Sequence, residues 1–206
     1  MPAVVTTENN KRTAILDIAS DLFLAKGYAG ASINEMYRRT GISKETFYRY
    51  FKDKEMLFLA VIDKELESYW QGLAILDEVQ KEQDTRETLT RVGGDLIFYL
   101  SSKRVRLLRQ LIFNECENHP LIGQLYYDHG PERAYRAFTA YFDHQKDKGL
   151  NWRFDSNTLA ESFVALLLHK ITLQQSCRIE DTASESSSHL LAGKIVDHFL
   201  NAYMLE

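Results

Sequence analysis

The chain has 206 residues, of which 45% are hydrophobic and 12% aromatic, and this composition argues against a wholly disordered protein. Its net charge of −4 would alone argue against a polyanionic partner, but the charge is unevenly distributed. Residues 1–55 hold nine Lys or Arg against seven Asp or Glu, so a mildly basic head precedes an acidic body.

The apolar residues repeat with a helical period along nearly the whole chain, and only three prolines and ten glycines interrupt them. The first predicted helix starts near residue 10 and carries an apolar face over residues 15–23. In the next helix, Ser32 is the predicted N-cap and Glu35 reaches back to complete a capping box. Gly41 then ends this short helix.

Ser43 is the predicted N-cap of a third helix that runs to about Phe51, and Asp53 caps a fourth helix that continues past residue 70. The remaining predicted helices span about 84–101, 103–117, 121–128, 131–149, 156–178 and 186–204. We therefore predict an all-α fold of about nine or ten helices, with one domain at 1–53 and a second at 54–206.

Two short helices joined by a glycine-containing break have the spacing of a helix-turn-helix, whose second helix enters the major groove of DNA. Such a helix needs one face packed on the head and one polar face. Phe47 and Phe51, at positions i and i+4, can both turn inward. The outer arc then holds Lys44, Glu45, Thr46, Tyr48 and Arg49. The residues near the helix start are placed for base edges, and the Tyr48 hydroxyl suits a phosphate oxygen.

Residues 12–57 resemble the DNA-binding domain of the TetR family of bacterial transcriptional repressors. The resemblance lies in the stretches "ILDIASDLFLAKGYAGASINEM" and "TGISKETFYRYFKDKEML". The matching positions are Gly27, Tyr28, Ser32, Gly41, Tyr48, Tyr50, Phe51 and Lys54. The resemblance implies a three-helix DNA-binding head joined to a C-terminal helical bundle for ligand binding and dimerisation.

The same resemblance implies that Ser43, Lys44 and Thr46 face bases or backbone, and that Tyr48 faces a phosphate. Lys54, at the start of the fourth helix, and Ser32 would add contacts to the DNA backbone. The full candidate DNA-binding set is Ser32, Ser43, Lys44, Glu45, Thr46, Tyr48, Arg49, Tyr50 and Lys54.

Two residues depart from the family pattern. Tyr37 stands where the family usually has alanine, so the packing there must be adjusted. Glu45 replaces a small residue in the recognition helix. A carboxylate facing DNA is unfavourable unless it accepts from a cytosine amine, so Glu45 either reads a cytosine or points aside.

The C-terminal body resembles, more loosely, a domain type found in some TetR-family repressors, including regulators of efflux genes. This resemblance lies in "LRQLIFNECENHPLIGQLYYDHGPERA" and "DSNTLAESFVALL", and it implies a ligand-responsive core and a dimer interface built from the last two helices. Those helices also carry an apolar surface wide enough for burial on two sides, although two central helices of a monomeric bundle would look the same. The predicted interface residues are Leu159, Phe163, Leu166, Leu167, Leu191, Ile195 and Phe199.

A ligand pocket is expected among the fourth to eighth helices, and its aromatic content favours an apolar or aromatic compound. Its candidate lining residues are Trp70, Phe98, Phe113, Tyr141 and His169, each of which is equally compatible with ordinary core packing. The ligand would favour a dimer whose two heads are wrongly spaced for DNA.

These observations predict a repressor that binds a pseudo-palindromic operator in double-stranded DNA as a homodimer and is released by an unknown small-molecule effector. The alternative is a DNA-binding factor of the same fold that has an architectural or cell-division role and no small ligand. A sizeable cavity would favour the first, and a closed core the second.

An enzyme is the rival from another class, and the motifs argue against it. The six histidines lack H-x-x-x-H and H-E-x-x-H spacing, and no G-x-S-x-G motif or phosphate-binding glycine loop occurs. Cys116 and Cys177 lie far apart without C-x-x-C spacing. We expect no catalysis, no cofactor and no metal site. Without a signal peptide or an apolar run of about 18 residues, a soluble, cytoplasmic protein without membrane contact is expected.

Overall fold

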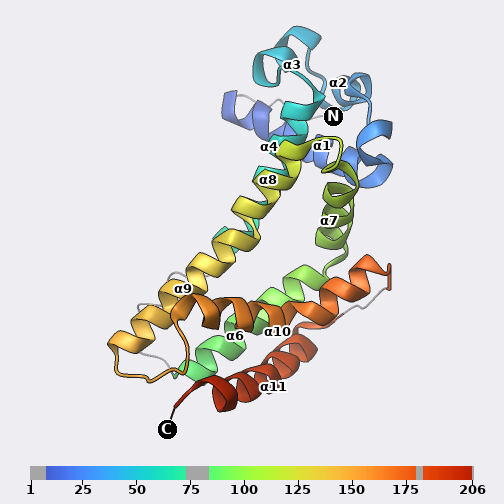
Figure 1. The fold of residues 1–206 in the computed structure, drawn as a ribbon. Helices are drawn as coiled ribbons and strands as arrows, with labels where there is room; N and C mark the ends of the chain where they lie inside the picture. The colour runs from blue at the N-terminus through green and yellow to red at the C-terminus, as the bar shows by residue number, and fades with distance from the viewer. Residues whose placement is uncertain (1–7, 73–83, 180–182, 206) are drawn as a thin grey trace. The chain divides into compact units, whose positions relative to one another are not determined.

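The computed structural model describes residues 8–72, 84–179 and 183–205, and this part of the chain is helical, as predicted. Apart from an isolated bridge between Trp152 and Met204, the described residues form no β-structure. The helices, labelled in Figure 1, are α1 (Glu8–Gly30), α2 (Ile33–Thr40), α3 (Lys44–Tyr50), α4 (Lys54–Gly72), α6 (Thr85–Ser101), α7 (Lys103–Glu115), α8 (Pro120–His129), α9 (Pro131–Asp147), α10 (Ser156–Ser176) and α11 (Glu185–Tyr203).

Two of the three predicted N-caps in the head are confirmed. The Ser43 hydroxyl accepts a hydrogen bond from the Thr46 N–H at 3.1 Å, and an Asp53 carboxylate oxygen accepts from the Met56 N–H at 2.8 Å. Each satisfies one of the amides that the first turn of a helix leaves without an intrahelical partner.

The predicted capping box at the start of α2 is wrong. Ser32 has the extended backbone of an N-cap, but its side chain makes no capping hydrogen bond. The Glu35 carboxylate instead accepts from Lys26 and from Arg39, each at 2.6 Å. Two cationic donors outcompete one backbone amide, because charge-assisted hydrogen bonds are the stronger ones.

The chain divides into two compact units, and the first combines residues 1–68 with Leu107–His129. Its core takes rings and aliphatic side chains from α1, α2 and α3, among them Phe23, Met36 and Phe47. It also includes side chains from α4, α7 and α8, among them Phe58 and Ile112. The predicted domain boundary at residue 53 does not coincide with the division between the two units, and it stays a prediction.

The second unit combines Tyr69–Arg106 with residues 130–206, and α6, α10 and α11 lie side by side within it (Figure 1). Its centre is a cluster of rings, in which Phe142, Phe163 and Phe199 have centroids 5.1 to 6.4 Å apart. At the α6–α11 contact, Gly94 brings the helix backbone against His189, and the Arg86 guanidinium binds Asp197 through two hydrogen bonds of 2.6 and 2.9 Å.

Candidate nucleic-acid interface

The turn between α2 and α3 sets the position of the candidate recognition helix. Gly41 adopts φ 69°, a left-handed conformation that favours glycine, and its N–H donates to the Tyr37 carbonyl at 2.9 Å. Ser43 then starts α3 through its cap. The two helices are therefore held by local interactions that the turn sequence encodes.

The inner face of α3 is aromatic and buried, as predicted. Phe47 is 0% exposed and Phe51 is 3% exposed. The ring of Phe47 meets that of Tyr37 edge-on, with centroids 5.1 Å apart, and lies 5.8 Å from that of Phe51. These contacts fix the rotation of α3 about its own axis, and so determine which side chains face outward.

The outer face of α3 carries the predicted DNA-binding side chains. Ser43, Lys44, Glu45, Tyr48 and Arg49 are exposed, and Thr46 and Tyr50 are half-buried. The Lys44 ammonium lies 5.8 Å from the centroid of the Tyr48 ring, so a positive charge and a hydroxyl are presented together. This arrangement suits a DNA backbone, whose phosphates attract cations and accept hydrogen bonds.

Lys54 is tied to the head more closely than the other candidate residues. Its ammonium lies 4.7 Å from the Tyr28 ring centroid and donates to the Ala29 carbonyl at 3.3 Å. Burial lowers the pKa of Lys54, and Glu115 partly opposes this shift. Lys54, at the start of α4, therefore contacts the end of α1. The sequence analysis did not predict this contact. Ser32, the remaining candidate, is exposed.

The five predicted pocket residues differ in burial and belong to two units. Trp70 and Tyr141 are buried in the core of the second unit. Phe98 and His169 belong to the same unit and are exposed, whereas Phe113 belongs to the first unit and is 50% exposed. Helical periodicity marks a residue as apolar-facing but does not say which neighbours surround it.

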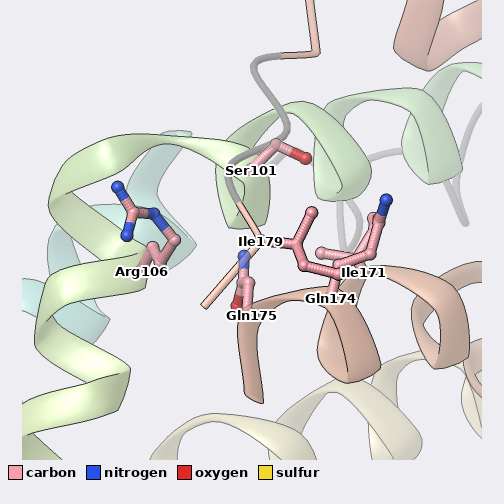
Figure 2. Close-up of a pocket in the computed structure, with 6 residues that line it drawn as sticks. All are labelled: Ser101, Arg106, Ile171, Gln174, Gln175 and Ile179. Carbon is pink, nitrogen blue, oxygen red and sulfur yellow. The ribbon is translucent and has the colours of Figure 1, made fainter. Parts of the chain in front are cut away.

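A small cavity lies in the second unit, where the end of α6 and the start of α7 meet the end of α10 (Figure 2). The Gln175 side chain beside it donates to the Leu100 carbonyl at 2.6 Å. The cavity volume is about 10 Å³, which is room for about one water molecule and far below a drug-sized site. Its lining residues are Ser101, Arg106, Ile171, Gln174, Gln175 and Ile179.

The prediction for the dimer interface needs a correction at four of its seven residues. Leu159, Phe163, Leu167 and Phe199 are at most 1% exposed, so they fill the unit's own core and have no surface left for a partner. The other three, Leu166, Leu191 and Ile195, are exposed or half-buried. The exposed apolar side chains on α10 and α11 are Leu166, Leu173, Leu190 and Leu191.

Metal-ligating clusters and membrane-spanning helices were also sought in the described part of the chain. It contains no group of three or more His, Cys, Asp or Glu side chains that could hold a metal ion. None of its helices is long and apolar enough to cross a membrane.

Two family models match the chain. Residues 15–61 match the model described as bacterial regulatory proteins, tetR family, and residues 87–204 match the C-terminal domain of AefR-like transcriptional repressors. The second match alone spans more than half of the chain, and the two together reach both compact units.

Curated relatives match over part of their length. The transcriptional activator FasR of Mycolicibacterium smegmatis is 30% identical over 115 residues, which cover 56% of this chain and 51% of FasR. The regulator EthR of Mycobacterium tuberculosis is 31% identical over 90 residues, which cover 44% of this chain and 41% of EthR. The matched region thus spans about half or less of these relatives.

Solved structures match over nearly the whole chain. A putative TetR-family transcriptional regulator from Mesorhizobium loti superposes with a TM-score of 0.89 at 25% identity, covering 97% of this chain and 100% of that one. The flavonoid-responsive regulator FrrA superposes with a TM-score of 0.77 at 24% identity, covering 95% and 98%, and this likeness shows the fold alone.

Proposed function

The chain belongs to the TetR family of DNA-binding transcriptional regulators, and from this premise we propose that it is a repressor that binds a pseudo-palindromic operator as a homodimer. We further propose that a small-molecule effector releases it from DNA. A protein with this role acts in the cytoplasm, where bacterial DNA lies.

The division of α3 into a buried and an exposed face carries the proposal. Phe47 is 0% exposed, whereas the next residue, Tyr48, is 45% exposed. The Lys44 ammonium lies over the Tyr48 ring. A helix held rigidly from behind can present polar side chains to the major groove without losing much conformational entropy on binding. Contacts of Ser43, Lys44 and Thr46 with bases or backbone, and of Tyr48 with a phosphate, follow from this placement.

The exposed leucines of α10 and α11 support the homodimer. Leu166 is 39% exposed, Leu173 55% and Leu190 65%. Covering apolar side chains of this size with a partner removes them from water, which stabilises the complex. Twofold symmetry would place two copies of α3 about one helical turn of DNA apart, and this geometry reads an inverted repeat.

We infer an effector from the family membership of the chain and from the aromatic content of the second unit. An apolar or aromatic compound fits that content, and FrrA is described as flavonoid-responsive. Such a ligand would act by binding one arrangement of the dimer more tightly than another. The cavity of about 10 Å³ beside Gln175 is too small for such a ligand.

The DNA-binding part is tested with duplexes that the purified wild-type protein selects from a random pool. In gel-shift titrations we expect Lys44→Ala and Tyr48→Ala to abolish binding while the circular dichroism spectrum stays unchanged. Lys148→Ala, which removes an exposed lysine just after α9, is the matched control and should bind as the wild type does. Unchanged affinity in folded Lys44→Ala and Tyr48→Ala variants would refute the proposed interface.

A second candidate is a DNA-binding factor of the same fold without an effector. A thermal-shift screen of flavonoids and other aromatic compounds separates the two. A compound that raises the melting temperature and weakens binding to the selected duplex supports the effector-released repressor. Compounds that change neither quantity support the second candidate.

A further inference from the structure

Tyr37 connects the buried side of the head to the outer face of the candidate recognition helix. It lies on α2, and its ring meets the Phe47 ring edge-on at 5.1 Å between centroids and 80° between planes. Phe47 in turn meets Tyr48 edge-on at 5.6 Å and 85°. Three rings therefore form a continuous contact from α2 to the side of α3 that faces outward.

The Tyr37 hydroxyl oxygen is shielded from solvent, yet it has no hydrogen-bond partner among the described residues. Burial, and after it the neighbouring Tyr48 hydroxyl, raises the pKa of Tyr37 to about 12. The two hydroxyls thus lie close enough for Tyr48 to raise the pKa of Tyr37. A buried hydroxyl without a partner costs free energy, so its position calls for an explanation.

We propose that Tyr37 is a positioning residue for DNA binding, whose hydroxyl donates a hydrogen bond to the Tyr48 oxygen and directs the Tyr48 O–H toward a backbone phosphate. The inference rests on the proposed function, because it assigns a role to a residue that does not itself touch DNA. It also gives the tyrosine that departs from the family pattern a function beyond packing.

The direction of the two hydrogen bonds follows from the chemistry of the groups. A phosphate oxygen only accepts, so Tyr48 must use its single O–H as the donor to the phosphate. The Tyr48 oxygen then keeps lone pairs free to accept, and Tyr37 is protonated at neutral pH and supplies the donor. Each bond in such a chain polarises the next, so the outer bond to the phosphate strengthens when the inner bond forms.

The test is a double-mutant cycle that removes only hydroxyl groups. Fluorescence anisotropy measures the affinity of Tyr37→Phe, Tyr48→Phe and the double variant for a labelled duplex selected by the wild-type protein. We expect Tyr37→Phe to weaken binding by about three- to tenfold, as for one hydrogen bond, and the double variant to bind no more weakly than Tyr48→Phe. Tyr127→Phe removes an exposed hydroxyl from α8 and should leave the affinity unchanged.

A merely structural role for Tyr37 would give other results. The ring contact with Phe47 survives in Tyr37→Phe, so we expect the urea midpoint to stay at or above that of the wild type. Wild-type affinity in Tyr37→Phe would overturn the inference, and so would losses that multiply in the double variant. If the wild-type protein itself selected no DNA, the proposed function would fail, and this inference with it.

Discussion

The recognition helix of the first unit and α10 of the second unit are buried in different ways. In α3, Phe47 lies in the core and Lys44 on the surface, while Thr46 and Tyr50 are half-buried. In α10, Phe163 and Leu167 are buried while Leu166, between them in the numbering, is 39% exposed. α3 packs through one face, so its other face stays available for polar side chains. α10 packs against α6, α9 and α11, so most of its apolar residues are buried within its own unit.

The two units also need glycine for different reasons. Gly41 has φ 69° and open space around its Cα, so the backbone conformation requires glycine there. Gly94 is helical, and a Cβ at that position would lie 2.4 Å from the His189 ring and 2.9 Å from the His189 Cα. The head uses glycine to turn the chain, and the second unit uses it to bring two helices together.

The largest expected effect tests the buried face of the head. Phe47→Ala removes a side chain that is 0% exposed and should lower the free energy of unfolding by about 3–5 kcal/mol, measured by urea denaturation. Tyr48→Ala, one residue away on the exposed face, should cost much less. Similar losses for both would contradict the division of α3 into two faces.

The next effect tests the close approach of α6 and α11. Gly94→Ala should lower the free energy of unfolding by about 1–3 kcal/mol, because the His189 backbone must move away. Gly193→Ala is the control, since its Cβ would meet only the Thr90 methyl at an ordinary 3.6 Å. We expect this control to keep or slightly raise stability, because alanine favours helix over glycine. A well-tolerated Gly94→Ala would show that the two helices separate easily.

A third variant tests the apolar surface that the second unit leaves exposed. Leu191→Glu should raise the dissociation constant of the dimer by about tenfold or more, measured by analytical ultracentrifugation, because a carboxylate cannot be buried unpaired. Leu121→Glu, at an equally apolar and more exposed site on α8 of the first unit, should leave the dimer intact. Equal weakening by both variants would place the interface elsewhere.

The smallest effect concerns exposed ion pairs. Hydrogen bonds from Arg86 hold the pKa of Asp197 below its ordinary 3.8, so this pair stabilises the fold at neutral pH and the contribution is lost as the pH falls through the lowered value. Asp197→Asn should therefore lose less stability than the wild type between pH 7 and about pH 3, measured as the shift in urea midpoint. Asp143→Asn, on the exposed side of α9, serves as the control, and a wild-type response in Asp197→Asn would contradict this role for the pair.

Sequence patterns were enough to predict the helices, the turn at Gly41, the cap at Ser43 and the two faces of α3. These features depend on interactions within a few residues along the chain, so periodicity and capping preferences suffice to predict them. The predicted capping box at Ser32 and Glu35 failed because Lys26, on the preceding helix, competes for the carboxylate.

The identity of the apolar residues of α10 and α11 that remain exposed, and of the predicted pocket residues that are buried, depended instead on tertiary packing. Leu159 and Leu166 look alike in a helical pattern, but the first is covered by its own unit and the second is not. Burial of this kind depends on neighbours that are far away along the chain, as at Gly94 and His189. The same dependence hid the unpartnered Tyr37 hydroxyl, whose significance is visible only once α2 and α3 are packed together.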